Sequence, residues 1–509
     1  MPDLGRAFLA AAARSPAACA IVEGERRLSY ADWLERIFAA VAGLDALGLR
    51  PGDHLVTALR NRLEAATLHW ACQLAGVIVT PVNWRATPGE LAFVLGDAHA
   101  RALVYEPASA PAVVAAGAEG VPRIAIDGGP GSTGSWAGVF ETARPAAGVA
   151  PRATGDDISL MLYTSGTTGR GKGVPRRHRA EHAAALSCIA HHQYAFGEST
   201  LGVMPLYHTM GVRALLVSAL LGGRFVCQPR FDAAEALDLI ESERLTALFL
   251  VPTLYHDLLS HPSFSPERVA SVRRASFAGM PMTDALVRRV REGIRPDLFV
   301  NHYGSSEVFT FTIEQRAHAK PGSAGRAGLG QEVRIVRLGS TDSEDVVGTP
   351  GEEGQIVVRL DHDEAFDGYW RRPDADAKAL HRGWYFTGDT GHRDGEGDLF
   401  VTGRVDDMII SGGENITPVE VENVLSLHPA VAEVAVAGLP DERWGQRVAA
   451  FVVRREPVAR EALDAHCRAS SLPAFKRPRE YAFVRGIPKS PVGKILRRRL
   501  VAGEVEPAD

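Results

Sequence analysis

The chain has 509 residues, of which 46% are hydrophobic and 23% are charged, and its formal net charge is −5. A chain of this length exceeds what one hydrophobic core usually supports, so we expect two or more domains. The small negative charge gives no reason to expect nucleic acid or a membrane surface as a partner, and no apolar run reaches the roughly 18 residues of a membrane span.

Residues 1–22 contain apolar stretches that Asp3 and Arg14 interrupt, a pattern typical of an amphipathic helix and not of a secretory signal. Five cysteines are scattered along the chain without paired spacing. This usage predicts neither a zinc site nor a disulfide framework, and it indicates a reducing compartment. We therefore expect the protein in the cytoplasm.

Strand-like and helix-like segments alternate between about residues 55 and 311, which predicts an α/β fold. The clearest examples are strand-like 224–228, 247–251 and 274–278 and helix-like 233–242 and 283–292. Strand-like runs at 331–337 and 355–360 predict a β-rich portion, and a compact α+β unit begins near residue 404. We predict a large N-terminal domain, 1–403, of stacked α/β subdomains plus the β-rich portion, and a small C-terminal domain, 404–509.

The most distinctive stretch, residues 163–173, reads Y-T-S-G-T-T-G-R-G-K-G and follows an apolar run that predicts a buried strand. Glycines let the backbone approach an anion and turn its N–H groups toward it. The hydroxyl side chains add donors, and Lys172 adds a compact positive charge. The stretch is therefore typical of a loop that grips a polyphosphate, although taken alone it is also compatible with a flexible surface loop.

The same stretch nearly matches the G-x-x-x-x-G-K-[ST] loop of P-loop NTPases. That loop needs Ser or Thr at its last position and a helix that starts there. Here the last position is Gly173, and Pro175 follows two residues later. Since proline disfavours helical geometry in the preceding residue, we expect no helix at this point and no P-loop enzyme.

Further segments place polar residues and glycines beside apolar runs: M-P-L-Y-H-T-M-G at 204–211, N-H-Y-G-S-S-E at 301–307, W-Y-F-T-G-D at 384–389, S-G-G-E-N at 411–415 and K-S-P-V-G-K at 489–494. Glu307 offers a carboxylate for a metal ion. Asp389 is placed to bind sugar hydroxyls or to cap a turn. His208 lies among apolar residues, where a histidine with a purely structural role is the commoner case.

In this order the segments resemble the adenylate-forming superfamily of acyl-CoA synthetases, stand-alone adenylation domains and luciferases. The resemblance covers nearly the whole chain. It is closest to bacterial aryl-CoA ligases of the 4-chlorobenzoate and benzoate type, on the segments 205–208, 403–416 and 443–446. The resemblance implies that ATP, Mg²⁺ and coenzyme A take part. A carboxylic acid and ATP would give an acyl-adenylate and pyrophosphate, and the thiol of coenzyme A would then displace AMP to give a thioester.

The resemblance also implies roles for individual residues. Lys494 would bridge the substrate carboxylate and the α-phosphate, His208 would lie beside that carboxylate, and Glu307 with Thr168 would hold Mg²⁺. The implied nucleotide contacts are Thr164, Ser165, Gly166, Thr167, Thr168, Gly169 and Lys172 for the β- and γ-phosphates, Gly279, Met280, Pro281 and Tyr303 for the adenine, Gly304 and Ser305 beside it, Ser306 for the α-phosphate, and Asp389 and Arg404 for the ribose.

The C-terminal domain is mobile in this superfamily, with a hinge that matches Asp406. Its rotation would withdraw Lys494 and present Gly412 and Gly413 as a channel for the pantetheine arm. Trp444, Phe475 and the basic pair 476–477 are the implied coenzyme A contacts, with Arg85 as a weaker candidate. A homodimer is compatible with the resemblance.

The implied acyl pocket has six walls: His208, Phe249, Met280, His302, Gly304 and Phe309. Met280 and Phe309 are bulky, which favours a small aromatic or cyclic acid over a long alkyl chain. His302 is placed either to hydrogen-bond a ring substituent or to face away from the pocket. Four alternatives stay open: an enzyme loading a short or medium-chain acid onto coenzyme A or a carrier-protein thiol, an amino-acid-activating module, a luciferase-like oxygenase and a non-catalytic binding protein.

Overall fold

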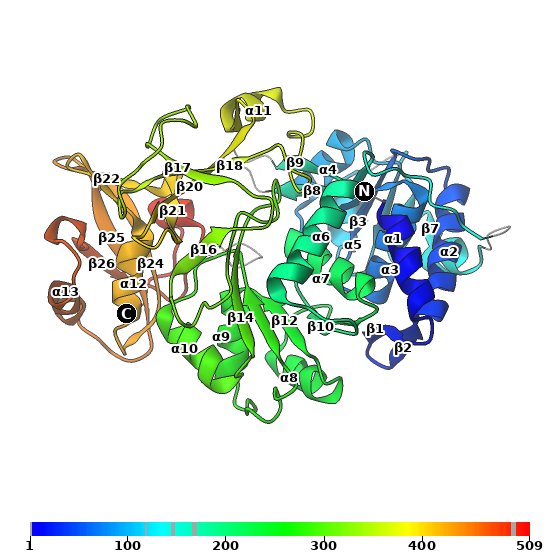
Figure 1. The fold of residues 1–509 in the computed structure, drawn as a ribbon, viewed down its shortest axis with the longest axis horizontal. Coiled ribbons are helices and arrows are strands. Elements are labelled where there is room, and N and C mark those ends of the chain that lie inside the picture. Colours follow the sequence, from blue (N-terminus) through cyan, green and yellow to red (C-terminus); the bar gives the residue numbers. More distant parts are fainter. Residues whose placement is uncertain (1–2, 118–119, 144–147, 165–170, 490–494, 509) are drawn as a thin grey trace.

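The computed structural model describes residues 3–117, 120–143, 148–164, 171–489 and 495–508. Its strands form a 14-stranded, a seven-stranded and a five-stranded sheet. The two larger sheets and their helices make up most of the molecule, and the smallest sheet belongs to the C-terminal unit, orange and red in Figure 1. This mixed α/β architecture, with a large N-terminal and a small C-terminal part, confirms the predicted fold class.

The parallel half of the 14-stranded sheet consists of β1 (Cys19–Glu23), β11 (Arg224–Cys227), β10 (Ser199–Gly202), β12 (Ala247–Leu250), β13 (Arg274–Phe277) and β14 (Leu298–Tyr303), with β2 (Arg26–Ser29) antiparallel at its edge. The strands β10 to β13 are four residues long and almost entirely buried, as is typical of parallel strands covered on both faces. One core joins them to α8 (Ala233–Ser242), α9 (Pro252–Ser260) and α10 (Asp284–Gly293).

The antiparallel half of the same sheet continues from β14 through β15 (Thr312–Glu314), β16 (Ser323–Ala327), β21 (Leu399–Arg404), β20 (Trp384–Arg393), β18 (Gly354–Arg359) and β17 (Val333–Val336). The short β19 (Leu380–His381) pairs with β20, directly after α11 (Pro373–Ala379). This half confirms the β-rich portion expected from residues 331–337 and 355–360.

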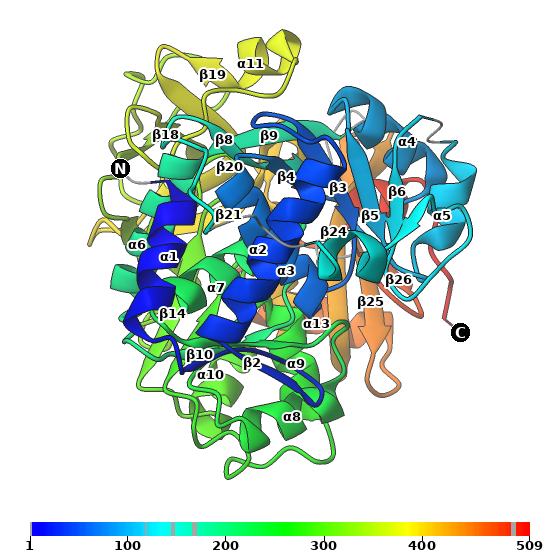
Figure 2. The same cartoon turned by 90° about the vertical axis from the view of Figure 1, so that its right-hand side faces the viewer.

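The seven-stranded sheet has the order β7 (Gly134–Ser135), β6 (Arg123–Ala125), β5 (Ala102–Tyr105), β3 (His54–Ala58), β4 (Ile78–Pro81), β8 (Ile158–Thr164) and β9 (Lys172–Arg177). Its helices are α2 (Tyr30–Ala46), α3 (Leu63–Ala75), α4 (Pro88–Asp97) and α5 (Ala110–Ala115). Helix α3 contacts both α1 (Leu4–Arg14) and α2, which lie beside it in Figure 2. The largest core joins these helices to α6 (His178–His192) and α7 (Thr209–Leu220), so it extends between the two large sheets.

The C-terminal unit contains the strands β22 (Ile409–Ser411), β23 (Glu414–Ile416), β24 (Val431–Asp441), β25 (Gly445–Arg454) and β26 (Glu480–Phe483) and the helices α12 (Pro418–Ser426), α13 (Arg460–Ala469) and α14 (Arg497–Val501). The large sheet's strand β21 ends at Arg404, and the next strand, β22, belongs to the five-stranded sheet. A short 3-10 turn, Val405–Asp407, joins them and contains Asp406.

Most predicted elements lie within one or two residues of their observed bounds, because their start and stop signals are local. Helix α10, for example, begins directly after Thr283, whose side chain accepts a hydrogen bond from the backbone N–H of Leu286. The segment 1–22 differs from its prediction, since its amphipathic helix ends at Arg14 and a strand follows. In the described part of the chain, none of the helices is both long enough and apolar enough to cross a bilayer.

Candidate active site

The glycine-rich stretch begins in one strand and ends in its antiparallel neighbour. Thr164, the last residue of β8, pairs with Lys172, the first residue of β9. A strand and not a helix therefore follows Lys172, which confirms that this is no P-loop. The expected phosphate contacts Ser165, Gly166, Thr167, Thr168 and Gly169 lie outside the described residues.

The ammonium group of Lys172 lies 4.1 Å from the centroid of the Tyr369 ring, a cation–π geometry. Burial lowers the pKa of Lys172 below its ordinary value, while the nearby Glu307 carboxylate opposes that shift. The Tyr369 hydroxyl donates a 2.8 Å hydrogen bond to Oε1 of Glu307. Lys172, the expected phosphate contact, and Glu307, the expected metal ligand, thus share one aromatic neighbour, which links the start of β9 to the turn after β14.

Glu307 belongs to a tight turn, residues 304–309, that is held by buried groups. Its backbone carbonyl accepts hydrogen bonds from Arg176 Nη1 at 2.7 Å and from the backbone N–H of Phe366 at 3.0 Å. Inside the turn, Ser305 Oγ accepts from the backbone N–H groups of Glu307 and Val308 at 3.2 and 3.3 Å. These contacts fix the backbone of the turn, and the Tyr369 hydroxyl then orients the carboxylate.

Gly304 makes this turn possible. A Cβ atom at position 304 would lie 1.7 Å from the backbone oxygen of Phe309, far inside van der Waals contact. Only a residue without a side chain therefore allows the chain to fold back so closely. Ser306, the expected α-phosphate contact, lies half-buried in the same turn.

The expected ribose residues meet across two adjacent strands. Asp389 on β20 pairs with Arg404 on β21, and Arg404 Nη1 donates to Asp389 Oδ1 at 2.7 Å. The other carboxylate oxygen accepts a 2.6 Å hydrogen bond from the Tyr303 hydroxyl. Burial raises the pKa of Tyr303 well above its ordinary value and Asp389 adds to this, so the phenol stays protonated. Asp389 lies within strand β20, where we expected a turn, and Gly388 before it has a φ of +74°.

Three of the expected adenine residues, 279–281, follow strand β13 of the parallel half, and the fourth, Tyr303, ends strand β14. Gly279 comes two residues after β13 and has a φ of +88°, a conformation that favours glycine. Pro281 is exposed and Met280 is half-buried. Strands β13 and β14 are parallel neighbours, with Phe277 paired to Asn301, so Gly279 and Tyr303 lie near the same carboxyl edge of the sheet. Ligands of open α/β sheets bind at this edge.

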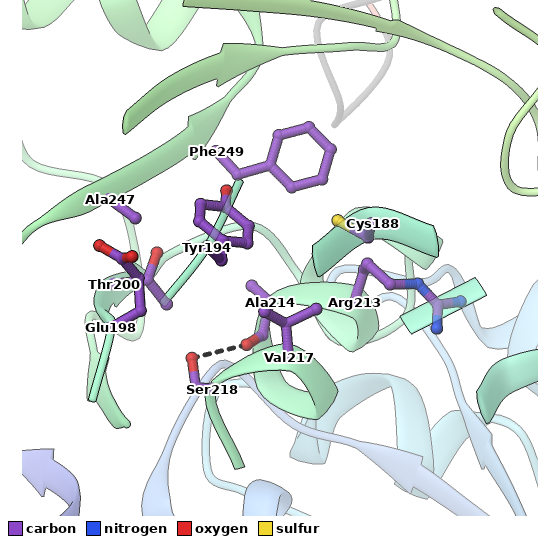
Figure 3. Close-up of a pocket in the computed structure, with 10 residues that line it drawn as sticks. All are labelled: Cys188, Tyr194, Glu198, Thr200, Arg213, Ala214, Val217, Ser218, Ala247 and Phe249. Carbon is purple, nitrogen blue, oxygen red and sulfur yellow. Dashed lines mark hydrogen bonds between the residues drawn. The ribbon is translucent and has the colours of Figure 1, made fainter. Parts of the chain in front are cut away.

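Three of the expected acyl-pocket residues form an aromatic group. The His302 ring lies 4.4 Å from that of Phe309 and 5.9 Å from that of Phe249, measured between centroids. Phe249 also lines a cavity of about 10 Å³ together with Cys188 and Tyr194, which are drawn in Figure 3. His208 immediately precedes α7 as its N-cap residue.

His302 differs from one of the two roles expected for it. Its Nε2 lies 3.1 Å from the Phe309 carbonyl, which can only accept, so this nitrogen carries the proton. Its Nδ1 therefore accepts from His192 Nε2 at 3.0 Å, and His192 Nδ1 accepts from the Tyr194 hydroxyl at 3.0 Å. Both ring nitrogens of His302 are engaged within the protein, so neither is left to hydrogen-bond a substrate.

Four residues that contact the site were not predicted from the sequence: Arg176, Glu181, Arg213 and Tyr369. Arg213 did carry a usable signal, because it is a lone charge in an apolar helix between Thr209 and Leu220. Tyr369 offers none, since its contact with Glu307 joins residues 62 positions apart.

The expected coenzyme A residues lie on the C-terminal unit, except the weaker candidate Arg85, which is exposed between β4 and α4 of the N-terminal part. Gly412 and Gly413, with φ of +63° and +87°, form the two-residue turn between β22 and β23. The Gly412 N–H donates to the Trp444 carbonyl at 2.8 Å, and a Cβ on Gly412 would lie 2.6 Å from the Trp444 ring. Phe475 is 42% exposed, and Asp406 is exposed. Lys494 lies outside the described residues.

Comparison with known proteins agrees with this architecture. The family described as AMP-binding enzyme matches residues 8–370, and the AMP-binding enzyme C-terminal domain matches residues 420–494. The chain therefore belongs to the AMP-binding enzyme family, the adenylate-forming superfamily that the motifs predict.

Three similar proteins span nearly the whole chain. A 4-chlorobenzoate–CoA ligase of Arthrobacter sp is 33% identical over 497 residues, 96% of this chain and 92% of the relative. The long-chain-fatty-acid–CoA ligase FadD13 of Mycobacterium tuberculosis is 33% identical over 509 residues, 98% and 97% of the two chains. The structure of the anthranilate CoA ligase AuaEII with anthranoyl-AMP superimposes with a TM-score of 0.90 at 26% identity and covers 98% of this chain and 97% of that chain.

Proposed function

We propose that the protein is an ATP-dependent carboxylate–CoA ligase whose acid is small and aromatic or cyclic. The observation that carries this proposal is the 304–309 turn. It places Glu307 beside Lys172 and Tyr369 on one side, and on the other it places Phe309 beside His302, which in turn lies beside Phe249. A single turn therefore separates a site suited to phosphates from an aromatic pocket suited to an acyl group.

The two-step chemistry suits these groups. A carboxylate is a poor acyl donor because oxide is a poor leaving group. Its oxygen attacks the α-phosphorus of ATP, the bond to pyrophosphate breaks, and the acid becomes an acyl-adenylate. The sulfur of coenzyme A then attacks the acyl carbon, and AMP leaves with the bonding electron pair while the thiol proton goes to solvent. The first step needs positioning and charge stabilisation, which fixed cationic groups provide.

We assign the nucleotide contacts from the described geometry and the resemblance together. Lys172 would bind the β- and γ-phosphates as a compact cation, and Asp389 would bind the ribose hydroxyls while Arg404 holds it in place. Glu307 fits a magnesium ion, because Tyr369 occupies Oε1 and no described residue hydrogen-bonds to Oε2. A bound Mg²⁺ would neutralise charge on the phosphates.

The C-terminal unit would act as a mobile domain, residues 404–509, against the body at 1–403. The exposed Asp406 lies in the short turn that leads from β21 of the 14-stranded sheet to β22 of the five-stranded sheet, which supports a hinge there. Rotation would withdraw Lys494, which is needed for adenylation, from the active site. It would bring in the turn of Gly412 and Gly413, which is needed to admit the thiol of coenzyme A. A mobile domain allows one pocket to serve two incompatible geometries.

The aromatic walls formed by Phe249, His302 and Phe309 support a compact acid. Ring faces pack well against one another, whereas a long alkyl chain needs an open channel. Acid-dependent exchange of pyrophosphate into ATP, measured over benzoates, cyclic acids and short and long alkyl acids, tests this. Thioester formation with coenzyme A completes the test. Exchange only with long-chain acids would overturn the acid class, and exchange without thioester would overturn the ligase.

A further inference from the structure

A buried carboxylate on α6 joins two arginines from other elements. Glu181 Oε1 accepts from Arg176 Nε at 2.8 Å, and Oε2 accepts from Arg213 Nη2 at 3.0 Å. Its backbone carbonyl accepts from Arg213 Nη1 at 2.6 Å. The three side chains are at most 1% exposed. Burial acts to raise the pKa of Glu181, but the two guanidinium groups outweigh it and hold that pKa below its ordinary value.

Fold stability does not explain this cluster. The free energy needed to remove charged groups from water is about as large as the electrostatic attraction between them in the interior. Replacing a buried ion pair by apolar side chains of similar volume therefore often leaves the stability unchanged or higher. Here both arginines pair with Glu181, and the charge of a second buried carboxylate, Glu364, also acts on both. Arg213 Nε and Arg176 Nη2 are buried without a hydrogen-bond partner among the described residues. The reason for keeping the arginines must lie in what else they contact.

Arg176 reaches the nucleotide side of the 304–309 turn. Its Nη1 donates a 2.7 Å hydrogen bond to the Glu307 carbonyl, although the two residues are 131 positions apart. Arg176 also lies on β9, the strand that begins with Lys172. It therefore ties the phosphate lysine's strand to the residue that offers the metal carboxylate.

Arg213 reaches the acyl side of the same turn. Its guanidinium carbon lies 4.4 Å from the centroid of the Phe309 ring. Arg213 is on α7, which starts next to His208, and Figure 3 shows its side chain beside Cys188 at the cavity lined by Phe249. It therefore supports the aromatic wall of the pocket from behind.

We propose that Arg176 and Arg213 are positioning residues, coupled through Glu181, that hold the two ends of the 304–309 turn. Arg176 sets Glu307 against the nucleotide, and Arg213 sets Phe309 against the acid. Because both bind one carboxylate, movement at either end of the turn is felt at the other, and acid and nucleotide bind cooperatively. This inference rests on the proposed ligase function.

The test uses Arg176→Met, Arg213→Met and the double variant in the full chain. Each single substitution leaves Glu181 paired with the remaining arginine, and the double variant also carries Glu181→Gln, so that no buried carboxylate is left unpaired. In pyrophosphate exchange, Arg213→Met should raise KM for the acid about tenfold and leave KM for MgATP within about twofold. Arg176→Met should raise KM for MgATP about tenfold, leave KM for the acid within about twofold, and require a higher Mg²⁺ concentration for activity. The double variant should lose less than the product of the single losses, as coupled residues do.

Glu106→Gln is a matched control, because Glu106 is also fully buried and binds an arginine, Arg60, away from this turn. It should lower the unfolding temperature without separating the two KM values. The proposal would be overturned if either arginine variant changed KM for the acid and KM for MgATP equally. It would also be overturned if the loss of activity in the double variant equalled the product of the losses in the two single variants. If a methionine variant does not fold, Arg176→Lys or Arg213→Lys replaces it and must change one of the two KM values much more than the other, as expected for the methionine variant. A wild-type protein without exchange would refute the ligase function itself.

Discussion

The Tyr369 hydroxyl donates a 2.8 Å hydrogen bond to the Glu307 carboxylate. Burial and this carboxylate together raise the pKa of Tyr369, so the phenol remains a donor. Its ring also contacts the ammonium of Lys172. One aromatic side chain thus orients the two charged groups expected to meet the triphosphate.

Glu307→Gln should lower kcat for adenylation about a hundredfold, because the neutral amide cannot hold Mg²⁺ against the phosphates. Pyrophosphate exchange over a range of Mg²⁺ concentrations measures this. Tyr369→Phe keeps the ring beside Lys172 and removes only the hydrogen bond, so its loss should be smaller. Equal activity of Glu307→Gln and wild type would show that Glu307 has no role at the metal.

Gly304→Ala should abolish adenylation, because the new methyl group would displace the Phe309 carbonyl and with it the whole turn. A Cβ on Gly395 would meet no atom within 4 Å, which makes Gly395→Ala the control. Exchange activity and the unfolding temperature of both variants are the measurements. Near-normal exchange in Gly304→Ala would mean that the turn adopts another conformation.

Lys494→Ala should lose pyrophosphate exchange by several orders of magnitude yet still convert a supplied acyl-adenylate to thioester. The reason is that Lys494 would contact the substrate in the first step alone. Lys489→Ala is the control on the same C-terminal unit, because Lys489 pairs with Glu433 at 2.8 Å. A similar fall in both half-reactions would refute the assignment.

Acid should destabilise the fold through His302, whose pKa burial lowers to about 3. Below about pH 6.5 the His302 imidazole binds a proton in the unfolded chain but stays neutral in the folded protein. The free energy of unfolding therefore falls until the pH nears the pKa of the folded state. Between pH 6.5 and pH 5 this loss amounts to about 2 kcal/mol. His302→Gln should therefore show a smaller drop in unfolding temperature from pH 7 to pH 5 than wild type. His318→Gln, at a half-exposed position, should keep the wild-type drop; an unchanged drop in His302→Gln would contradict the prediction.

Short local sequence patterns predicted many of the strands and helices. Strands at 224–228, 247–251 and 274–278 and helices at 233–242 and 283–292 were predictable, because burial period, caps and breakers act between neighbouring residues. The role of His302 was not predictable in the same way. Its orientation depends on His192, 110 residues earlier, and on the Phe309 carbonyl.

By itself, the sequence determined the α/β class, the family and the order of the nucleotide-binding segments, because these reside in short runs such as 163–173 and 301–307. Only the tertiary structure decided that Tyr369 joins Lys172 to Glu307, and that Glu181 links Arg176 to Arg213. Those contacts join distant positions through burial and hydrogen-bond geometry. A single sequence records the residues but not which of them become neighbours.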